Sequence, residues 1–318
     1  MIVISHEEIE SLKITPEEYL KWIEVSISEK KTAVLPPKIS LKPEEGQFYN
    51  FMPSILPKQK VSGIKVVNRY PNRVPTLDSQ ILLYNLETGK NVAILDGNLI
   101  TTMRTGAVAA HSILKLEKEA TCVYSFIGLG NQARSTAYVL SSVLKNKAIT
   151  FKLLRYKDQH VKFADFLKKY YSDEVTIIFV DTYEEAIRGS DVVISSVTYF
   201  DQDIVDDLSW FNEGVLLVPI HTRGFLNCDR YFDKIFADDK GHVEGFKYFS
   251  EFKHFSEVSD ILEDNEKGRA NNSEKIIAYN IGLGIHDLFF ANKIFKKFTL
   301  TEKKEEINLN NIMDKYYL

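Results

Sequence analysis

The sequence predicts an α/β protein with a doubly wound parallel sheet and a second, α+β domain. Strands and helices alternate from about Ala120 to Phe236, and this alternation is typical of a parallel sheet with helices on both faces. The strands of this stretch are nearly continuous apolar runs, as expected of strands buried on both sides. The part before Glu117 differs, because its β-type segments are interrupted by prolines.

The elements follow in order along the chain. Thr15 can cap a first helix whose first turn holds two glutamates. The remaining elements expected in the first part are strands at 63–68 and 80–86, a hairpin-type turn at 87–90 and a helix at about 99–116. In the alternating part, strands are expected at 122–127, 150–154, 176–180, 191–196, 215–219 and 234–237, and helices at 132–143, 159–170 and 182–187. Residues 238–318 are expected to be helical and to end in a charged tail.

The composition excludes several classes of protein. A chain of 318 residues corresponds to about two domains. Its 44% apolar and 26% charged residues exclude a wholly disordered or collagen-like chain. A net charge of -4 gives no basic field that would attract nucleic acid. The two cysteines, Cys122 and Cys228, lie in no C-x-x-C, which excludes a zinc ribbon and favours a reducing compartment.

The sequence also bounds localisation and metal content. The first ten residues hold acidic side chains where a signal peptide has a basic start and an apolar core. No apolar run reaches 18 residues. We therefore expect a cytoplasmic protein with no membrane contact. No two histidines have the i, i+4 spacing of helical metal ligands, so we also expect no metal.

A glycine-rich turn ends the first strand of the alternating part. Gly128, Gly130 and Ala133 form G-x-G-x-x-A between an apolar strand and a helix, and another strand follows within about 30 residues. This is the dinucleotide fingerprint of the Rossmann fold in its required context. The glycines permit the tight turn and the approach of a pyrophosphate to the helix amino terminus. The alternative is a doubly wound domain that has lost its nucleotide.

The tip of the second strand of this part bears on the choice of cofactor. An NAD site places an acidic residue there, to bind the ribose 2′-hydroxyl. Here the place is taken by Arg155, and Lys157 follows. Two cations suit a 2′-phosphate, and Tyr156 could stack on adenine. The sequence therefore favours NADP(H) over NAD(H); the alternative is that both cations are surface charges and Asp158 binds the ribose.

Several motifs in a fixed order resemble those of the ornithine cyclodeaminase/μ-crystallin family over nearly the whole chain. The motifs are P-P-K (36–38), F-M-P (51–53), K-V-V-N (65–68), L-D-G (95–97), M-R-T-G-A (103–107), G-L-G-N-Q-A (128–133), S-D-V-V (190–193), G-R (268–269) and N-I-G-L-G-I-H-D (280–287). The resemblance implies a dimer-forming substrate domain followed by a Rossmann domain. It gives residues 1–118, completed by about 275–318, as the substrate-binding and dimerisation domain, and residues 119–274 as the dinucleotide-binding domain.

The resemblance also implies roles for individual residues. Lys65 and Arg104 correspond to the residues that bind the substrate carboxylate, and Lys38 to the lysine that faces the reacting carbonyl or amine. Without the resemblance, the alternatives are that Lys65 is an edge-strand lysine and that Arg104 is a surface arginine. His286 and Asp287 are expected to form a packed helical pair rather than a catalytic dyad. The residues implied around the cofactor are Thr105, Asn131, Gln132, Ser195, Ser196, Val197, Thr198 and Gly282.

Two positions depart from the family pattern. Cyclodeaminases of the family carry a catalytic aspartate in a G-x-D-x-P-G loop, and by ungapped counting Arg223 takes its place here. Amino-acid dehydrogenase members have an arginine where this chain has Asn50. An arginine cannot act as a base at neutral pH, so ornithine cyclodeamination is disfavoured. His221 in the same loop, or Lys38, could supply a proton instead; the alternative for His221 is a structural role.

These observations together predict an NADP(H)-dependent oxidoreductase. It would act on the C–N bond of a small amino or imino acid, as an imine or ketimine reductase or an amino-acid dehydrogenase, and would form a homodimer. The alternatives are an ornithine cyclodeaminase-type ammonia lyase and a non-catalytic NADPH-binding protein of the μ-crystallin type.

Overall fold

The computed structural model describes residues 1–197, 200, 202–301 and 307, and the chain divides into two compact units. The first unit consists of Met1–Ile14, Glu29–Thr101 and Gly284–Leu318, and the second of Thr15–Ser28 and Thr102–Leu283. These units differ at their edges from the predicted domains. Residues 15–28, 102–118 and 275–283 group with the second unit, and the division falls inside one long helix.

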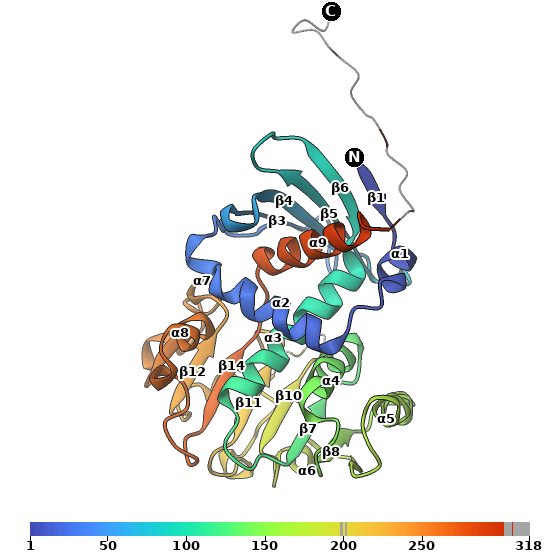
Figure 1. The fold of residues 1–318 in the computed structure, drawn as a ribbon. Helices are drawn as coiled ribbons and strands as arrows, with labels where there is room; N and C mark the ends of the chain where they lie inside the picture. The colour runs from blue at the N-terminus through green and yellow to red at the C-terminus, as the bar shows by residue number, and fades with distance from the viewer. Residues whose placement is uncertain (198–199, 201, 302–306, 308–318) are drawn as a thin grey trace, which may run out of the picture. The chain divides into compact units, whose positions relative to one another are not determined.

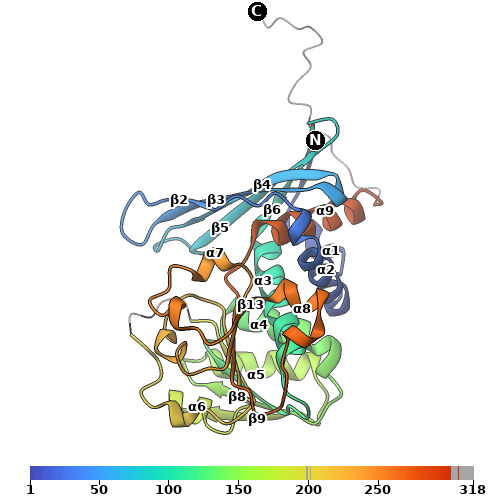
Figure 2. The same ribbon diagram turned by 90° about the vertical axis from the view of Figure 1, so that its left-hand side faces the viewer.

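The first unit is built on a six-stranded sheet with the order β1-β6-β5-β4-β3-β2. Strand β1 runs parallel to β6, and the other pairs are antiparallel. The strands are β1 (Ile2–Ile4), β2 (Ile39–Leu41), β3 (Phe48–Leu56), β4 (Val61–Arg69), β5 (Leu77–Asn85) and β6 (Asn91–Asp96). Figure 2 shows β2 beside β3 at one edge of this sheet. The helices are α1 (His6–Ser11) and α9 (Gly284–Phe298), with 3-10 turns η1 (Lys30–Thr32) and η2 (Pro57–Gln59).

One face of the six-stranded sheet forms the core of this unit. Alternate residues of β4 and β5 are buried, as expected for strands with one covered face. Helix α9 lies against β3, β4 and β5 (Figure 1) and buries apolar side chains around nearly its whole circumference. Such a helix belongs to a protein interior. A charged side chain that is buried on α9 therefore needs a partner of opposite charge.

The second unit is an eight-stranded parallel sheet with the order β13-β12-β14-β11-β10-β7-β8-β9. Its strands are β7 (Val123–Ile127), β8 (Thr150–Leu154), β9 (Thr176–Val180), β10 (Val192–Ser195), β11 (Leu216–Pro219), β12 (Lys234–Ala237), β13 (Phe255–Glu257) and β14 (Ile276–Tyr279). Its helices are α2 (Pro16–Ser28), α3 (Gly97–Leu116, shared with the first unit), α4 (Asn131–Leu144), α5 (Gln159–Tyr170), α6 (Tyr183–Ile187), α7 (Lys240–Val243) and α8 (Val258–Glu263). The 3-10 turns are η3 (Leu208–Trp210), η4 (Leu226–Cys228), η5 (Phe249–Glu251) and η6 (Asn265–Lys267).

The strand order gives this sheet the switch point at which the Rossmann fold binds its ligand. From β7 the chain builds outward through β8 and β9, and it then returns to the other side of β7 with β10. Ligands of such sheets bind outside the carboxyl ends of the strands at this switch point. The prediction of a doubly wound α/β fold with an additional α+β part is therefore confirmed.

The expectation that residues 238–318 are all helical is wrong. Strand β14 lies between β11 and β12, well inside the parallel sheet, and β13 forms its edge. A run of four apolar residues such as 276–279 has no period that separates a strand from a buried helical turn. Among the described residues, no helix has the length and apolar content needed to cross a membrane.

Candidate cofactor and substrate sites

The glycine-rich turn follows β7 at the switch point. Gly128 has φ +85°, a conformation that other residues rarely adopt. A Cβ atom there would lie 2.9 Å from the backbone carbon of Ser196, which follows β10. The Ser196 hydroxyl donates to the Gly128 carbonyl at 3.0 Å, and the Ser196 amide donates to the Ile127 carbonyl at 2.8 Å. The ends of β7 and β10 are thus held together by contacts that only glycine permits at position 128.

Helix α4 begins directly after this turn. Gly130 is its N-cap and supplies no side chain to bind the first amides. A Cβ atom at Gly130 would meet nothing within 4 Å, so space remains open above the first turn. Ala133, in the first turn of α4, is fully buried, and Gln132 Oε1 is buried with no hydrogen-bond partner among the described residues. Open amides, the helix dipole and an unsatisfied polar side chain fit the diphosphate of a dinucleotide.

Arg155 follows β8 and contacts Asp181 and Phe179. Its Nε lies 3.3 Å from Asp181 Oδ1, and its guanidinium lies 5.4 Å from the centre of the Phe179 ring. Tyr156 is exposed, and the Lys157 ammonium lies 5.3 Å from the centre of its ring. Asp158 pairs with Lys162 at 2.6 Å, one turn further along. The cations expected to read a 2′-phosphate are present at the strand tip, and Asp181 shares the charge of Arg155.

The loop after β11 places His221 against the end of β10. His221 Nε2 lies 2.7 Å from Ser195 Oγ. Burial lowers the pKa of His221 to about 4, against the opposing effect of a hydrogen bond with the backbone of Arg223. With a pKa this low the ring is largely neutral at pH 7, which makes His221 the weaker of the two residues predicted to supply a proton. The side chain of Arg223 is exposed. Thr198, expected near the cofactor, lies outside the described residues.

Arg104 lies on α3 and is buried. Its guanidinium packs directly on Gly282, where φ is +101° and where a Cβ atom would overlap the guanidinium. The Gly282 amide donates to Asp238, whose other carboxyl oxygen lies 3.0 Å from His242 Nδ1. Thr105, the next residue on α3, is also buried. The segment after β14 thus provides the surface against which Arg104 is held.

In the first unit, Lys65 forms an ion pair that the sequence did not reveal. Lys65 Nζ lies 2.7 Å from Asp287 Oδ2, and the two side chains are 1% and 0% exposed. From the sequence, Asp287 is expected to pack with its neighbour His286. A usable signal was present, because Asp287 stands in the first turn of a helix that is apolar on almost every side.

Asn50 and Lys38 lie toward the β2 edge of the same sheet. Asn50 Oδ1 accepts a hydrogen bond from Ser40 Oγ of β2 at 2.7 Å. Asn50 is two residues before Met52, the register partner of Lys65, so Asn50 and Lys65 share one face of the sheet. Lys38 is exposed just before β2 begins.

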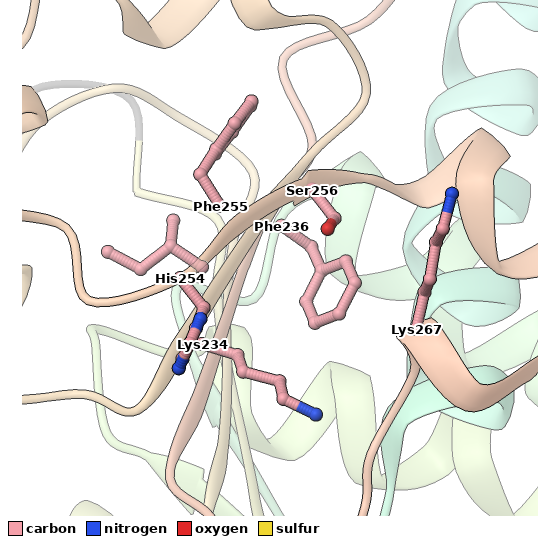
Figure 3. Close-up of a pocket in the computed structure, with 7 residues that line it drawn as sticks. Lys234, Phe236, His254, Phe255, Ser256 and Lys267 are labelled. Atoms are coloured by element: carbon pink, nitrogen blue, oxygen red, sulfur yellow. The ribbon is translucent and has the colours of Figure 1, made fainter.

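A pocket of about 220 Å³ in the second unit lies away from all predicted site residues. Figure 3 shows it between β12, β13 and η6, with Phe236 near the lysines and Ser256. Lys234 is engaged there by the Gly268 carbonyl at 2.7 Å and by Glu274 at 3.2 Å. Within the described part of the chain, no group of three acidic, histidine or cysteine side chains is placed to hold a metal ion.

Comparison with known proteins gives a consistent result. Residues 1–302 match the ornithine cyclodeaminase/mu-crystallin family. The nodulation efficiency protein NfeD of Rhizobium meliloti is 26% identical over 92% of this chain and 93% of its own length. The alanine dehydrogenase of Archaeoglobus fulgidus is 26% identical over 93% of this chain and 94% of its own. A structure of Thermococcus litoralis Δ1-pyrroline-2-carboxylate reductase with NADH and L-proline superposes with a TM-score of 0.83, at 24% identity over 96% of this chain and all of that one.

Proposed function

Because the chain belongs to the ornithine cyclodeaminase/mu-crystallin family, we propose that it is an NAD(P)-dependent oxidoreductase acting on the C–N bond of a small amino or imino acid. The observation that carries this proposal is the glycine turn and uncapped helix at the switch point of the second unit. Relatives named as alanine dehydrogenase and Δ1-pyrroline-2-carboxylate reductase, which match over nearly the whole chain, support the reaction class.

In this proposal the dinucleotide is held by the second unit. The first amides of α4, at Asn131 and Gln132, face its diphosphate, while Ser196 and Val197 border the turn. The bound nicotinamide supplies a hydride acceptor or donor, chemistry that amino-acid side chains lack. Structures of relatives contain NAD(H). NADP(H) as the preferred cofactor is our finer proposal, and it rests on Arg155 and Lys157 at the tip of β8.

The substrate carboxylate is assigned to Lys65 and Arg104. Both are buried cations, and a carboxylate taken out of water needs such partners. Asn50 is a neutral polar group on the same face of the sheet as Lys65. Lys38 is proposed as the residue that exchanges a proton with the substrate, because the lowered pKa of His221 makes its ring a poor proton donor at neutral pH. His221 and Ser195 then serve as a fixed hydrogen-bonding pair.

The loop that holds His221 also argues against cyclodeamination. Gly224 has φ +97°, a conformation that favours glycine. When the G-x-D-x-P-G pattern is set on Gly224, the place of its aspartate falls on His221 rather than Arg223. In either register the carboxylate is absent. A neutral imidazole offers a second amine of the substrate no negative charge, so a substrate with a single amino or imino nitrogen is favoured.

The proposal is tested by cofactor turnover. Oxidation of NADH and NADPH is followed with Δ1-pyrroline-2-carboxylate and with pyruvate plus ammonia, and the reverse direction with L-proline and L-alanine. Turnover of one pair is expected. Tight NAD(P)H binding without turnover would instead indicate a binding protein, and ammonia release from ornithine without net cofactor change would indicate a cyclodeaminase. Light scattering on the same preparation tests the homodimer that we propose.

Cofactor preference has its own test. Replacing the cation at the β8 tip with a carboxylate, Arg155→Asp, is expected to lower the NADPH-to-NADH ratio of kcat/KM by about tenfold or more, the size of a lost charge-assisted hydrogen bond. Lys168→Asp, an exposed charge reversal on α5, is the control and should leave the ratio unchanged. An unchanged ratio in Arg155→Asp would mean that the 2′-phosphate is bound elsewhere.

A further inference from the structure

Strand β9 forms one edge of the parallel sheet and lacks the features that usually keep such an edge unpaired. Its sequence is T-I-I-F-V, with no charged residue, proline or glycine. The side chains of Ile178 and Phe179 are 42% and 36% exposed. A strand edge presents unpaired amides and carbonyls, and proteins commonly protect it with charges, proline, a bulge or a covering segment. The edge of β9 is therefore suited to pairing with another strand.

The opposite edge of the same sheet has such protection. Strand β13 is only three residues long and contains Glu257. Lys253 and His254, both exposed, come directly before it. Short edge strands with charged side chains disfavour pairing with another chain. Of the two edges of this sheet, β9 is thus the one that is open to a partner.

The backbone of β9 determines which groups a partner can reach. The first and last residues of the strand, Thr176 and Val180, each make a 2.9 Å backbone hydrogen bond to a residue that flanks β8. Because the bonding direction alternates along a strand, the amides and carbonyls of Ile177 and Phe179 point to the open edge. No described residue bonds to these groups.

A groove of about 440 Å³ runs along this edge between α5 and β9. Its lining includes the buried side chains of Leu167, on α5, and Tyr171, which follows α5. From β9 it includes Ile177 and Phe179, which are two residues apart and so point to the same face of the sheet. An apolar side chain of a neighbouring strand, placed opposite Ile177, would lie over this groove.

We propose that β9 pairs with β9 of a second copy of this chain, antiparallel about a two-fold axis through Ile178. This register sets Ile177 of each copy opposite Phe179 of the other. Residues opposite each other at such positions exchange two hydrogen bonds, so the free backbone groups of both copies are used. The exposed ring of Phe179 of each copy lies over the groove of the other, as in an isologous contact that uses one surface twice. This contact is additional to the homodimer expected through the first unit.

Charges at the two ends of β9 complement each other in this arrangement. Asp173 and Glu174 come before the strand, are exposed and have no ion-pair partner among the described residues. At the other end, Arg155 bonds the last carbonyl of β9 and Lys157 follows, while Asp181 balances one of these two cations. Antiparallel pairing sets the acidic end of each copy beside the basic end of the other, which favours this partner and this orientation.

Ile178→Lys tests the contact in solution. It places two ammonium groups opposite each other at the axis, where like charges are destabilising, and an exposed lysine is compatible with a folded edge strand. We expect the wild type, measured by light scattering, to have at least about twice the molar mass of Ile178→Lys. Val143→Lys, at an equally exposed apolar position of α4, is the control and should keep the wild-type mass. Equal masses for the wild type and Ile178→Lys would overturn the proposal.

A disulfide tests the register of the pair. In Ile178→Cys the two thiols meet at the axis, where facing Cα atoms lie about 4.5 Å apart, within the range that a disulfide spans. Thr176→Cys is the matched control on the same face of β9, because the register sets Thr176 opposite Val180 and roughly 14 Å from its own copy. Both are made with Cys122→Ser, since Cys122 is exposed.

Oxidised glutathione should link Ile178→Cys into a covalent pair on a non-reducing gel and leave Thr176→Cys unlinked. Equal linkage in both variants, or none in Ile178→Cys, would overturn the proposed pairing. Neither measurement needs substrate turnover, so the result is independent of the proposed function.

Discussion

Arg104 shows how one backbone position can set the geometry of a binding residue. Its guanidinium lies on the bare backbone of Gly282, which is itself anchored through its amide to Asp238. The motif that contains Gly282 was visible in the sequence, but its link to Arg104 spans 178 positions of the chain. No local pattern reports such a contact, because it arises only when β14 enters the sheet.

A Gly282→Ala substitution is expected to displace Arg104. The added methyl group overlaps the guanidinium, and φ at +101° is unfavourable for alanine. We expect kcat/KM for the carboxylate substrate to fall about ten- to a hundredfold through loss of a charge-assisted contact, while the dissociation constant for NAD(P)H stays the same. Gly245→Ala, where a Cβ atom meets nothing within 4 Å, is the control. Weakened cofactor binding in Gly282→Ala would instead assign Gly282 to the cofactor site.

The ion pairs of Asp287 with Lys65 and of Asp181 with Arg155 could not be predicted from the sequence, for different reasons. Asp287 stands next to His286, and sequence adjacency suggested that pairing, whereas the helix period directs the carboxylate to β4. Asp181 lies 26 positions from Arg155, at the end of the next strand, and neighbouring parallel strands bring their ends together. Both contacts depend on which elements become neighbours, which single residues do not encode.

At the scale of elements, the glycine turn between β7 and α4 was predictable in full. Its motif, the strand before it and the helix after it are local features, and the structure has them within one or two residues of the predicted bounds. Strand β14 was missed because its four residues carry no local signal. It is stabilised by β11 and β12, whose register partners lie 60 and 42 positions earlier, respectively.

The turn makes a sharp prediction about cofactor binding. Gly128→Ala puts a methyl group 2.9 Å from the backbone of Ser196 and strains φ at +85°. The turn must then open, which moves the first amides of α4 away from the diphosphate. We expect the affinity for NAD(P)H, measured by fluorescence titration, to fall at least about tenfold, or about 1.4 kcal/mol.

A glycine with similar strain provides the control for this substitution. Gly89 has φ +68° in the hairpin after β5, and a Cβ atom there meets nothing within 4 Å. Gly89→Ala should cost stability of about 1 kcal/mol and leave the affinity for NAD(P)H intact. Equal losses of affinity in both variants would mean that strain alone, rather than the position of the turn, explains the effect of Gly128→Ala.

For the molecule as a whole, buried titratable groups set how stability depends on pH. Burial lowers the pKa of both His111 and His221 to about 4, and the His111 ring has no hydrogen-bond partner among the described residues. An unfolded histidine has a pKa of about 6.5. Below that pH, His111 and His221 become protonated in the unfolded chain but stay neutral in the folded protein. These two residues therefore make the protein less stable as pH falls from about 6.5 to 4.

Asp229 acts in the opposite direction. Burial raises its pKa to about 7, and the nearby Asp203 adds to the effect, while a 2.6 Å hydrogen bond from the Tyr279 hydroxyl opposes it. Between about pH 7 and 4 the folded protein holds a proton on Asp229 that the unfolded chain has released. Asp229 therefore adds stability as pH falls through this range. It offsets one of the two histidines, and the combined effect of the three groups is a moderate loss of stability in acid.

Asp229→Asn separates these opposing contributions. Asparagine keeps an acceptor for Tyr279 and never ionises, so the variant should be more stable than the wild type at pH 9, by about 2–4 kcal/mol for a shift of this size. Its stability should then fall more steeply between pH 6.5 and 4, because the histidines act unopposed. Urea unfolding followed by the fluorescence of Trp22 and Trp210 measures this, since both tryptophans belong to the unit that contains Asp229. Asp206→Asn, at an exposed position, is the control. If the free energies of unfolding of Asp229→Asn and the wild type differ by the same amount at every pH, protonation of Asp229 does not limit the loss of stability in acid.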